Sequence, residues 1–311
     1  MTDTMRAIVF DRYGDPSVLR EARVPVPVRR AGQVLIRVRA TGVNPADGKW
    51  RSGMFERSRP LRFPHIGGYD VAGEVVAADA GDLAPGTRIV ALLDVVAQGG
   101  YAEYAVVDRG SVAVIPDRLS FEDAATLPTP GLTGVQMIEE QLDVQPGQTI
   151  LLTGATGAVG RFALHAALGR GARVVAAVRA KHVAMAEALG ATRAIALGEG
   201  VSAEGAWTGA PFDHVADTVG GAVVADLCRR VRADGRIRTV STTPIPSDGL
   251  PVAPVFFGVH ADAARLAELA RAAAEGDVVV EIAARLPLAE TAEAQARVDA
   301  GTGGGRIVLI P

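Results

Sequence analysis

Short apolar runs separated by turn residues fill the first third of the chain. Val34, Ile36 and Val38 recur at every second position, the period of a strand that buries one face. Three further strands are expected at residues 71–78, 87–93 and 101–107, because Gly and Pro clusters separate these runs. Many short strands with turns between them indicate a barrel or a sandwich.

The pattern changes near residue 120 to an alternation of strands and helices. Ser120 has the position of a helix N-cap, with Asp123 in the first turn. Strands are expected at residues 149–153, 173–178, 213–217 and 236–240, and helices at residues 158–168, 183–189 and 223–231. Such alternation predicts an α/β domain with a parallel sheet and helices on both faces.

The last part of the chain changes character again. The sequence predicts an Ala-rich helix at residues 262–275, a strand at 278–282, a helix at 289–300 and a final strand at 306–310. We therefore divide the chain at residues 1–119, 120–255 and 256–311.

A glycine-rich turn follows the strand at residues 149–153 and opens an Ala-rich helix. The turn supplies the candidate cofactor-binding residues Gly154, Ala155, Thr156, Gly157, Ala158 and Val159, with Gly160 after them. Its G-x-x-G-x-x-G spacing differs from the G-x-G-x-x-G fingerprint, and glycines also serve ordinary tight turns. Between a strand and a helix, however, such a turn brings free N–H groups and the helix dipole to a pyrophosphate. This context predicts dinucleotide binding.

The second strand of this domain favours NADPH over NADH. NAD-binding versions end this strand with an acidic residue that holds the ribose 2′-OH. Here Arg179 and Lys181 follow the strand, and the first acidic residue is Glu187. Both cations suit a 2′-phosphate, Arg179 with bidentate geometry. The alternative is a solvated basic turn.

Composition excludes several other classes of protein. The net charge of −3 and the scattered basic residues argue against a nucleic-acid partner. Cys228 is the only cysteine, so an intrachain disulfide and a multi-cysteine zinc site are both excluded, and we expect it to be a small buried residue. The chain has no run of about 18 apolar residues and no secretory pattern near its start, so the cytoplasm is the expected compartment.

Six motifs in order along the chain resemble the zinc-independent quinone oxidoreductases, the zeta-crystallin-like branch of the medium-chain dehydrogenase/reductases. They are residues 42–47 (GVNPAD), 67–73 (GGYDVAG), 100–104 (GYAEY), 127–133 (LPTPGLT), the glycine-rich turn and residues 304–309 (GGRIVL). The resemblance implies a GroES-like catalytic domain at residues 1–119, a Rossmann domain at 120–255 and a return segment at 256–311 that completes the first domain. It also implies a cofactor in the cleft between the domains, and a homodimer.

The residues at the family's zinc positions predict that this chain holds no catalytic metal. Zinc-dependent members carry Cys where Asn44 stands and a His-Glu pair where Tyr69 and Asp70 stand. A tetrahedral N/S site is therefore missing from the first domain. We expect His65 to be a loop or core residue, and the other histidines show no ligand spacing. Without a Lewis acid, alcohol oxidation is disfavoured and hydride addition to an activated acceptor is favoured.

The expected activity is an NADPH-dependent reduction of a quinone or an α,β-unsaturated carbonyl. Both acceptors gain negative charge on oxygen, so the site needs a hydrogen-bond donor and a proton source. The catalytic candidates are Asn44, whose family equivalent lies beside the nicotinamide, and Lys49, where many members carry Tyr and some carry Lys. Alternatively, Asn44 belongs to an Asn-Pro turn and Lys49 contacts the cofactor or is exposed.

Further cofactor-binding candidates follow the later strands of the Rossmann domain. Thr218, Val219, Ser241 and Thr242 stand at carboxyl ends of parallel strands, where ligands bind in open α/β sheets, although such residues also occur in ordinary polar loops. The resemblance adds Phe257 near the nicotinamide.

Two other functions stay open. The chain also suits a small polyketide-type enoyl reductase, or a non-catalytic NADPH-binding protein like the relatives recruited as crystallins. The sequence does not identify the physiological acceptor.

Overall fold

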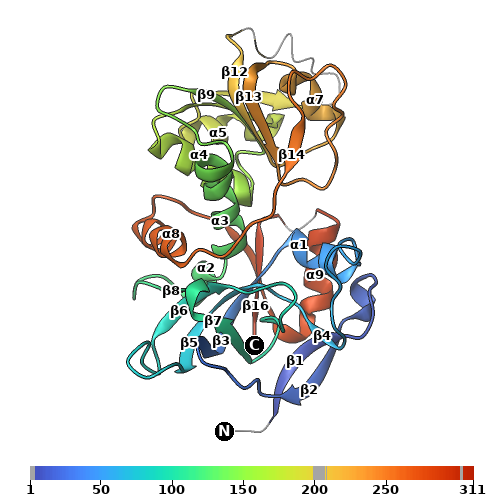
Figure 1. Ribbon diagram of the computed structural model, residues 1–311, viewed down its shortest axis with the longest axis vertical. Coiled ribbons are helices and arrows are strands. Elements are labelled where there is room, and N and C mark those ends of the chain that lie inside the picture. Colours follow the sequence, from blue (N-terminus) through green and yellow to red (C-terminus); the bar gives the residue numbers. More distant parts are fainter. Residues whose placement is uncertain (1–3, 199–206, 208, 302–303) are drawn as a thin grey trace. The chain divides into compact units, whose positions relative to one another are not determined.

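The chain folds into two compact units, described here from a computed structural model that covers residues 4–198, 207, 209–301 and 304–311. The first unit combines residues 1–129 with residues 261–311, and the second comprises residues 130–260. Figure 1 shows the elements of both units in chain order. The helix after Ser120 belongs to the first unit, because it packs on strands β3 and β5.

The first unit is built around two sheets that share an apolar core. A seven-stranded sheet has the order β15-β16-β3-β5-β6-β8, with β7 paired to β3, and a three-stranded sheet has the order β2-β1-β4. The strands are β1 (Thr4–Phe10), β2 (Arg20–Pro25), β3 (Gln33–Val43), β4 (His65–Ile66), β5 (Asp70–Ala77), β6 (Arg88–Leu92), β7 (Tyr104–Asp108), β8 (Val112–Val114), β15 (Ile282–Pro287) and β16 (Arg306–Ile310). The last strand, β16, pairs antiparallel with β3 and so brings the end of the chain beside residues 41–43.

Short helices cap and flank these sheets. They are α1 (Pro45–Arg51), α2 (Phe121–Ala124), α8 (Ala263–Glu275) and α9 (Thr291–Asp299), with 3-10 turns η1 (Pro16–Val18), η2 (Arg109–Ser111) and η5 (Leu288–Glu290). Helix α1 packs against α9, and α8 packs against β8. Helix α1 follows β3 directly, so the sheet register fixes where this helix starts.

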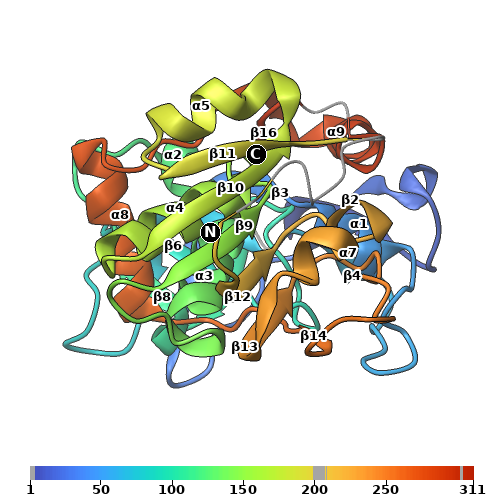
Figure 2. The ribbon, with the colours of Figure 1, turned by 90° about the horizontal axis from the view of Figure 1, so that it is seen from above.

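The second unit is a parallel six-stranded sheet with the order β11-β10-β9-β12-β13-β14, whose strands lie side by side in Figure 2. Its strands are β9 (Thr149–Thr153), β10 (Arg173–Arg179), β11 (Arg193–Leu197), β12 (Phe212–Asp217), β13 (Val231–Thr239) and β14 (Pro254–Phe256). Its helices are α3 (Pro128–Gln136), the π-helix η3 (Met137–Gln141), α4 (Ala158–Gly169), η4 (Ala180–His182), α5 (Val183–Ala188) and α7 (Ala222–Cys228). The order reverses between β9 and β12, which is the point where ligands bind in doubly wound sheets.

The predicted fold class is confirmed, and several elements agree residue by residue. The strands at residues 149–153 and 306–310 have the expected bounds, and Ser120 caps α2 by accepting the Asp123 N–H. The strand expected at residues 278–282 is wrong: β15 spans Ile282–Pro287, where half-buried and exposed positions alternate. Cys228 and His65 are buried as expected. No helix of the described residues is long and apolar enough to cross a bilayer.

Candidate functional site

The first position of the glycine-rich turn in the second unit requires glycine. Gly154 has φ +67°, and a Cβ there would lie 2.3 Å from the Thr218 hydroxyl oxygen. Gly157 is exposed and forms the N-cap of α4 without a side-chain hydrogen bond to the helix. The first N–H groups of the helix therefore lack the usual side-chain cap, as a bound phosphate requires.

Gly160 lets helix α4 approach the turn. A Cβ on Gly160 would lie 2.1 Å from the Gly154 carbonyl oxygen and 2.7 Å from the Ala155 Cα. Ala155 is fully buried, whereas Thr156, Ala158 and Val159 are half-buried. The turn thus fits the pyrophosphate of a dinucleotide with small residues on every close approach.

Basic side chains gather at the carboxyl end of β10. Arg179 ends the strand, and Lys181 lies in the turn η4; both are exposed. Besides burial, the charges of Lys181, Arg179 and Arg161 lower the pKa of His182, which places all three cations near this imidazole. Arg161 also donates to the Thr156 carbonyl at 3.1 Å, so it joins this basic cluster to the glycine-rich turn.

Asp217 organises the carboxyl ends of three neighbouring strands. This fully buried carboxylate accepts the Thr153 hydroxyl and the Thr239 hydroxyl, each at 2.6 Å. It also accepts the Val219 N–H at 3.1 Å and the Gly220 N–H at 3.0 Å. The edge of the sheet beside the glycine-rich turn is thereby fixed.

Around this edge lie the predicted cofactor-binding residues Thr218, Val219, Ser241 and Thr242. Their side chains differ in exposure and in hydrogen bonding. The Thr218 hydroxyl donates to the Thr153 carbonyl at 2.8 Å, and the Ser241 hydroxyl donates to the Val219 carbonyl at 2.9 Å. Val219 is 38% exposed, and Thr242 is half-buried. Phe257 follows β14 and is buried, with its N–H bonded to the Thr239 carbonyl.

In the first unit, Asn44 lies in a buried polar cluster. Its Nδ2 donates to Asp70 Oδ2 at 2.9 Å, and its Oδ1 accepts from Arg306 Nη1 at 2.6 Å. Arg306 Nη2 also lies 3.1 Å from Asp70 Oδ2, and Thr129 donates its N–H and hydroxyl to Asp70 Oδ1. Burial raises the pKa of Asp70, and the Arg306 charge opposes this rise.

Helix α1 carries the second catalytic candidate, Lys49, in its last turn. Lys49 is half-buried, and burial lowers its pKa. No carboxylate among the described residues forms an ion pair with its Nζ. Asp47 on the same helix is 2% exposed and accepts the Asn44 N–H and the Tyr101 hydroxyl, each at 2.7 Å. Burial raises the pKa of Asp47 to about 7.

Four residues of these clusters were missed from the sequence. Asp217 and Arg306 bond to residues far away along the chain, which no local pattern reports, and Arg161 contacts the turn through a backbone carbonyl. Asp47 was noticed only as part of a motif. The chain has 32 basic residues, and the candidates Lys49 and Lys181 are its only lysines.

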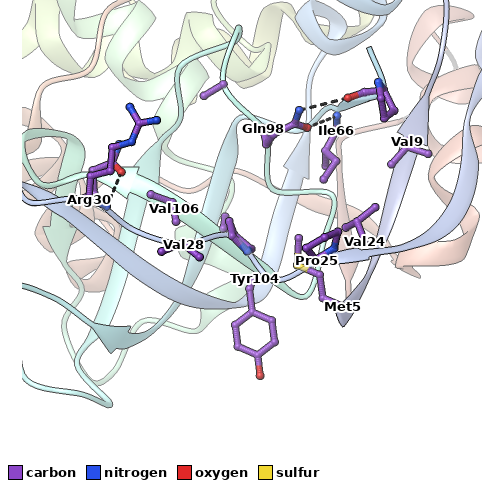
Figure 3. Close-up of a pocket in the computed structure, with 16 residues that line it drawn as sticks. Met5, Val9, Val24, Pro25, Val28, Arg30, Ile66, Gln98, Tyr104 and Val106 are labelled. Carbon is purple, nitrogen blue, oxygen red and sulfur yellow. Dashed lines mark hydrogen bonds between the residues drawn. The ribbon is translucent and has the colours of Figure 1, made fainter. Parts of the chain in front are cut away.

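A cavity in the first unit does not include either catalytic candidate. It has a volume of about 550 Å³, and its lining includes Met5 of β1, Val24 of β2 and Val106 of β7 (Figure 3). Within the described part of the chain, no three His, Cys, Asp or Glu side chains lie together as a metal site requires. His65 is fully buried, its ring nitrogens have no hydrogen-bond partner, and burial lowers its pKa to about 4.

Comparisons with known proteins agree with this architecture. Residues 30–117 match the model of the alcohol dehydrogenase GroES-like domain, and residues 189–309 match that of the zinc-binding dehydrogenases. A chloroplast envelope quinone oxidoreductase homolog of Arabidopsis thaliana is 28% identical over 99% of this chain and 98% of its own length. The human quinone oxidoreductase is 35% identical over 55% of this chain and 52% of its own length.

Solved structures of two kinds of enzyme are similar over nearly the whole chain. The quinone oxidoreductase of Coxiella burnetii has a TM-score of 0.84 at 26% identity and covers 99% of both chains. A cobalt- and zinc-bound alcohol dehydrogenase of Pyrobaculum aerophilum has a TM-score of 0.81 at 26% identity, covering 99% of this chain and 100% of its own. The chain belongs to the medium-chain dehydrogenase/reductase superfamily, in its quinone oxidoreductase branch.

Proposed function

We propose that this oxidoreductase uses NADPH to reduce a quinone or an α,β-unsaturated carbonyl, without a catalytic zinc ion. The observation that carries the proposal is the bonding of Asn44 and Asp70 in the first unit. These residues stand where zinc-dependent relatives place metal ligands, and here both bond to the Arg306 guanidinium. An amide is also a poor ligand for zinc, which prefers thiolate, imidazole and carboxylate.

The second unit supplies the support for NADPH. The turn from Gly154 to Val159 would hold the pyrophosphate, and the exposed Arg179 and Lys181 would hold the 2′-phosphate. Arg161 adds a third positive charge near the same turn. When bound, NADPH supplies the hydride, and the protein supplies orientation and electrostatics.

Asn44 and Lys49 have the chemistry that the acceptor requires. The acceptor oxygen gains negative charge, which an amide N–H stabilises by hydrogen bonding and an ammonium group can protonate. Asn44 donates one amide hydrogen to Asp70, so its second amide hydrogen is the one available for an acceptor. Lys49 is desolvated without a carboxylate to neutralise it, which is the setting of a proton donor rather than of a surface cation.

Cofactor preference is tested by Michaelis constants for NADPH and NADH in the wild type and in Arg179→Ala. Loss of one charge-assisted contact should raise the constant for NADPH about tenfold or more and leave that for NADH nearly unchanged. Arg173→Ala is the matched control, because Arg173 is exposed at the opposite end of the same strand. An unchanged preference in Arg179→Ala removes this residue from the 2′-phosphate site.

The reaction is tested by NADPH oxidation with 9,10-phenanthrenequinone and with a panel of enones, alongside metal analysis of the purified protein. Turnover of either acceptor by zinc-free protein is the expected result. Tight NADPH binding without turnover of any acceptor favours a non-catalytic NADPH-binding protein. Stoichiometric zinc on which activity depends contradicts the proposed mechanism.

A further inference from the structure

Arg306 is the most deeply buried cation in the cluster around Asn44. Its side chain is 6% exposed, and the carboxylate of its partner Asp70 is 0% exposed. The guanidinium reaches two different groups, because Nη1 donates to Asn44 Oδ1 at 2.6 Å and Nη2 donates to Asp70 Oδ2 at 3.1 Å. The fork of an arginine suits this double contact, whereas a lysine offers a single point charge.

The two contacts leave Asn44 only one orientation of its amide. A guanidinium only donates hydrogen bonds, so the atom of Asn44 that faces it must be the oxygen. An ionised carboxylate only accepts, so the atom that faces Asp70 must be the nitrogen. If the Asn44 amide were flipped, its N–H groups would face the N–H donors of Arg306, and its oxygen would face the carboxylate oxygen of Asp70.

The backbone of Asn44 is also held in place at the start of helix α1. It is the N-cap of α1, where an asparagine side chain often accepts an N–H of the first turn. Here the Asp47 N–H bonds to the Asn44 backbone carbonyl, and the Asp47 carboxylate accepts the Asn44 N–H in return. The side-chain oxygen of the same residue accepts from Arg306 Nη1, so backbone and side chain of Asn44 are both fixed.

The backbone around Arg306 is built to admit its guanidinium. A Cβ on Gly42 would lie 2.7 Å from Arg306 Nη2 and 2.4 Å from the Ala125 carbonyl oxygen. Gly42 stands two residues before Asn44 on the same strand and pairs with Val308 of β16. The absent side chain at this position therefore makes room for the cation beside Asn44 and Asp70.

We propose that Arg306 is the positioning residue of this centre: it holds the Asn44 amide so that one N–H is fixed on Asp70 and the other is presented to the acceptor oxygen. This inference rests on the proposed function, because it assigns Arg306 a role that acts only through Asn44. Arg306 itself touches neither substrate nor cofactor in this account.

A double-mutant cycle on turnover tests the role. Arg306→Lys keeps the charge that balances Asp70 and removes the fork, so kcat should fall about tenfold to a hundredfold with little change in the KM for NADPH. Arg306→Lys combined with Asn44→Ala should be no slower than Asn44→Ala alone, within about twofold, because the arginine acts through the asparagine. Arg88→Lys is the control: it removes another arginine fork in the same unit, one that bonds the Asp117 and Leu119 carbonyls, and should leave kcat unchanged.

A spectroscopic readout does not depend on activity. Asn44 is the only asparagine in the chain, so selective labelling with [15Nδ2]-asparagine gives one side-chain nitrogen resonance with a pair of amide proton signals. In the wild type we expect one proton protected from solvent exchange, from the bond to Asp70. In Arg306→Lys we expect that protection to weaken or a second amide conformer to appear, while Arg88→Lys keeps the wild-type spectrum.

The outcomes separate this inference from the proposed function. A wild-type protein without turnover of any quinone or enone contradicts the proposed function itself. With turnover established, wild-type kcat in Arg306→Lys or in Asn44→Ala overturns the inference. Effects that multiply in the double variant also overturn it, as does an amide signal that Arg306→Lys leaves unchanged.

Discussion

At the scale of single residues, Lys49 combines burial with the lack of a neutralising partner in the described structure. Desolvation disfavours the ammonium form, so the pKa of Lys49 lies below the 10.5 of an ordinary lysine. A proton donor with such a pKa transfers its proton more readily at neutral pH than a solvated lysine does. This lysine should therefore control the basic side of the pH profile.

We predict that kcat falls on the basic side at a pH below 10.5, as the Lys49 ammonium loses its proton. Lys49→Met should lower kcat by about a hundredfold, the typical loss for a general acid, and should abolish this basic limb while NADPH affinity stays nearly intact. The buried Tyr69 and Tyr101 should not produce this basic limb, because burial raises the pKa of each well above 10.0. Steady-state kinetics from pH 6 to 10.5 are the measurement. A basic limb that persists in Lys49→Met assigns it to another group.

Asp47 gives a prediction about stability rather than turnover. Its pKa is 3.8 as an ordinary carboxyl and about 7 in the folded protein, so the folded state binds the proton more tightly. The free energy of unfolding contributed by this proton is present below pH 4 and is lost as the pH rises to about 7. Asp47→Asn should retain the bonds from Asn44 and Tyr101 and should be more stable than the wild type by about 2–4 kcal/mol at pH 8.

The comparison should be made by urea unfolding of both proteins at pH 4.5 and pH 8. The gain of Asp47→Asn should shrink towards zero at the lower pH. His65 has the opposite effect on the pH dependence of stability. Burial lowers its pKa from 6.5 to about 4, so its contribution to the free energy of unfolding is lost as the pH drops through that range. It is present in both proteins and cancels in the difference. A gain that does not vary with pH contradicts the raised pKa of Asp47.

The residue scale also shows the limit of sequence reasoning about the site. Arg179 and Lys181 are predicted to bind the cofactor because their place after a strand has a chemical meaning in a dinucleotide domain. Arg306 lies 262 positions from Asn44 along the chain, and no period or motif links the two. Asp217 was identified only as the end of a strand, since its bonds to Thr153 and Thr239 depend on how three strands are ordered in the sheet.

At the scale of elements, the spacing of apolar residues and the positions of turn residues predict the parallel unit well and the short helices poorly. Strand β9 and helix α4 were found because an apolar run, a glycine-rich turn and an Ala-rich stretch follow each other. Helix α3 was missed, because Pro128, Pro130 and Gly131 look like breakers. Prolines in a first turn lose no hydrogen bond, since those N–H groups have no partner within the helix.

Two glycines in helix α4 allow a matched test of its approach to the turn. Gly160→Ala puts a Cβ 2.1 Å from the Gly154 carbonyl, so it should cost about 1–3 kcal/mol of unfolding free energy and weaken NADPH binding at least tenfold. Gly169→Ala meets no atom within 4 Å and should be neutral or stabilise by up to about 1 kcal/mol. Denaturant unfolding and NADPH fluorescence titration of both variants are the measurements. Equal behaviour of the two variants contradicts the close-packing role of Gly160.

At the scale of the whole molecule, family resemblance rather than the spacing of apolar residues predicts that the end of the chain returns to the first unit. The resemblance assigned the last residues to the first domain, and β16 indeed pairs with β3. Apolar patterning alone marks residues 306–310 as a strand but does not choose its sheet. Assembly is the remaining property at this scale, and the resemblance predicts a homodimer.

An exposed edge of the parallel sheet offers a place for that dimer. In the described structure β14 pairs only with β13, and its residues Val255 and Phe256 are 45% and 50% exposed. A free edge with apolar side chains invites pairing with another strand, and a two-fold axis lets two copies of β14 meet. We therefore expect a dimer in solution and a monomer for Phe256→Lys, because burying a charged side chain in the interface is costly.

Val114→Lys is the matched control, since Val114 is 52% exposed on a strand that α8 packs against, and it should leave the dimer intact. Light scattering coupled to size-exclusion chromatography distinguishes the two masses. A wild-type monomer, or a Phe256→Lys dimer as stable as the wild type, removes β14 from the interface.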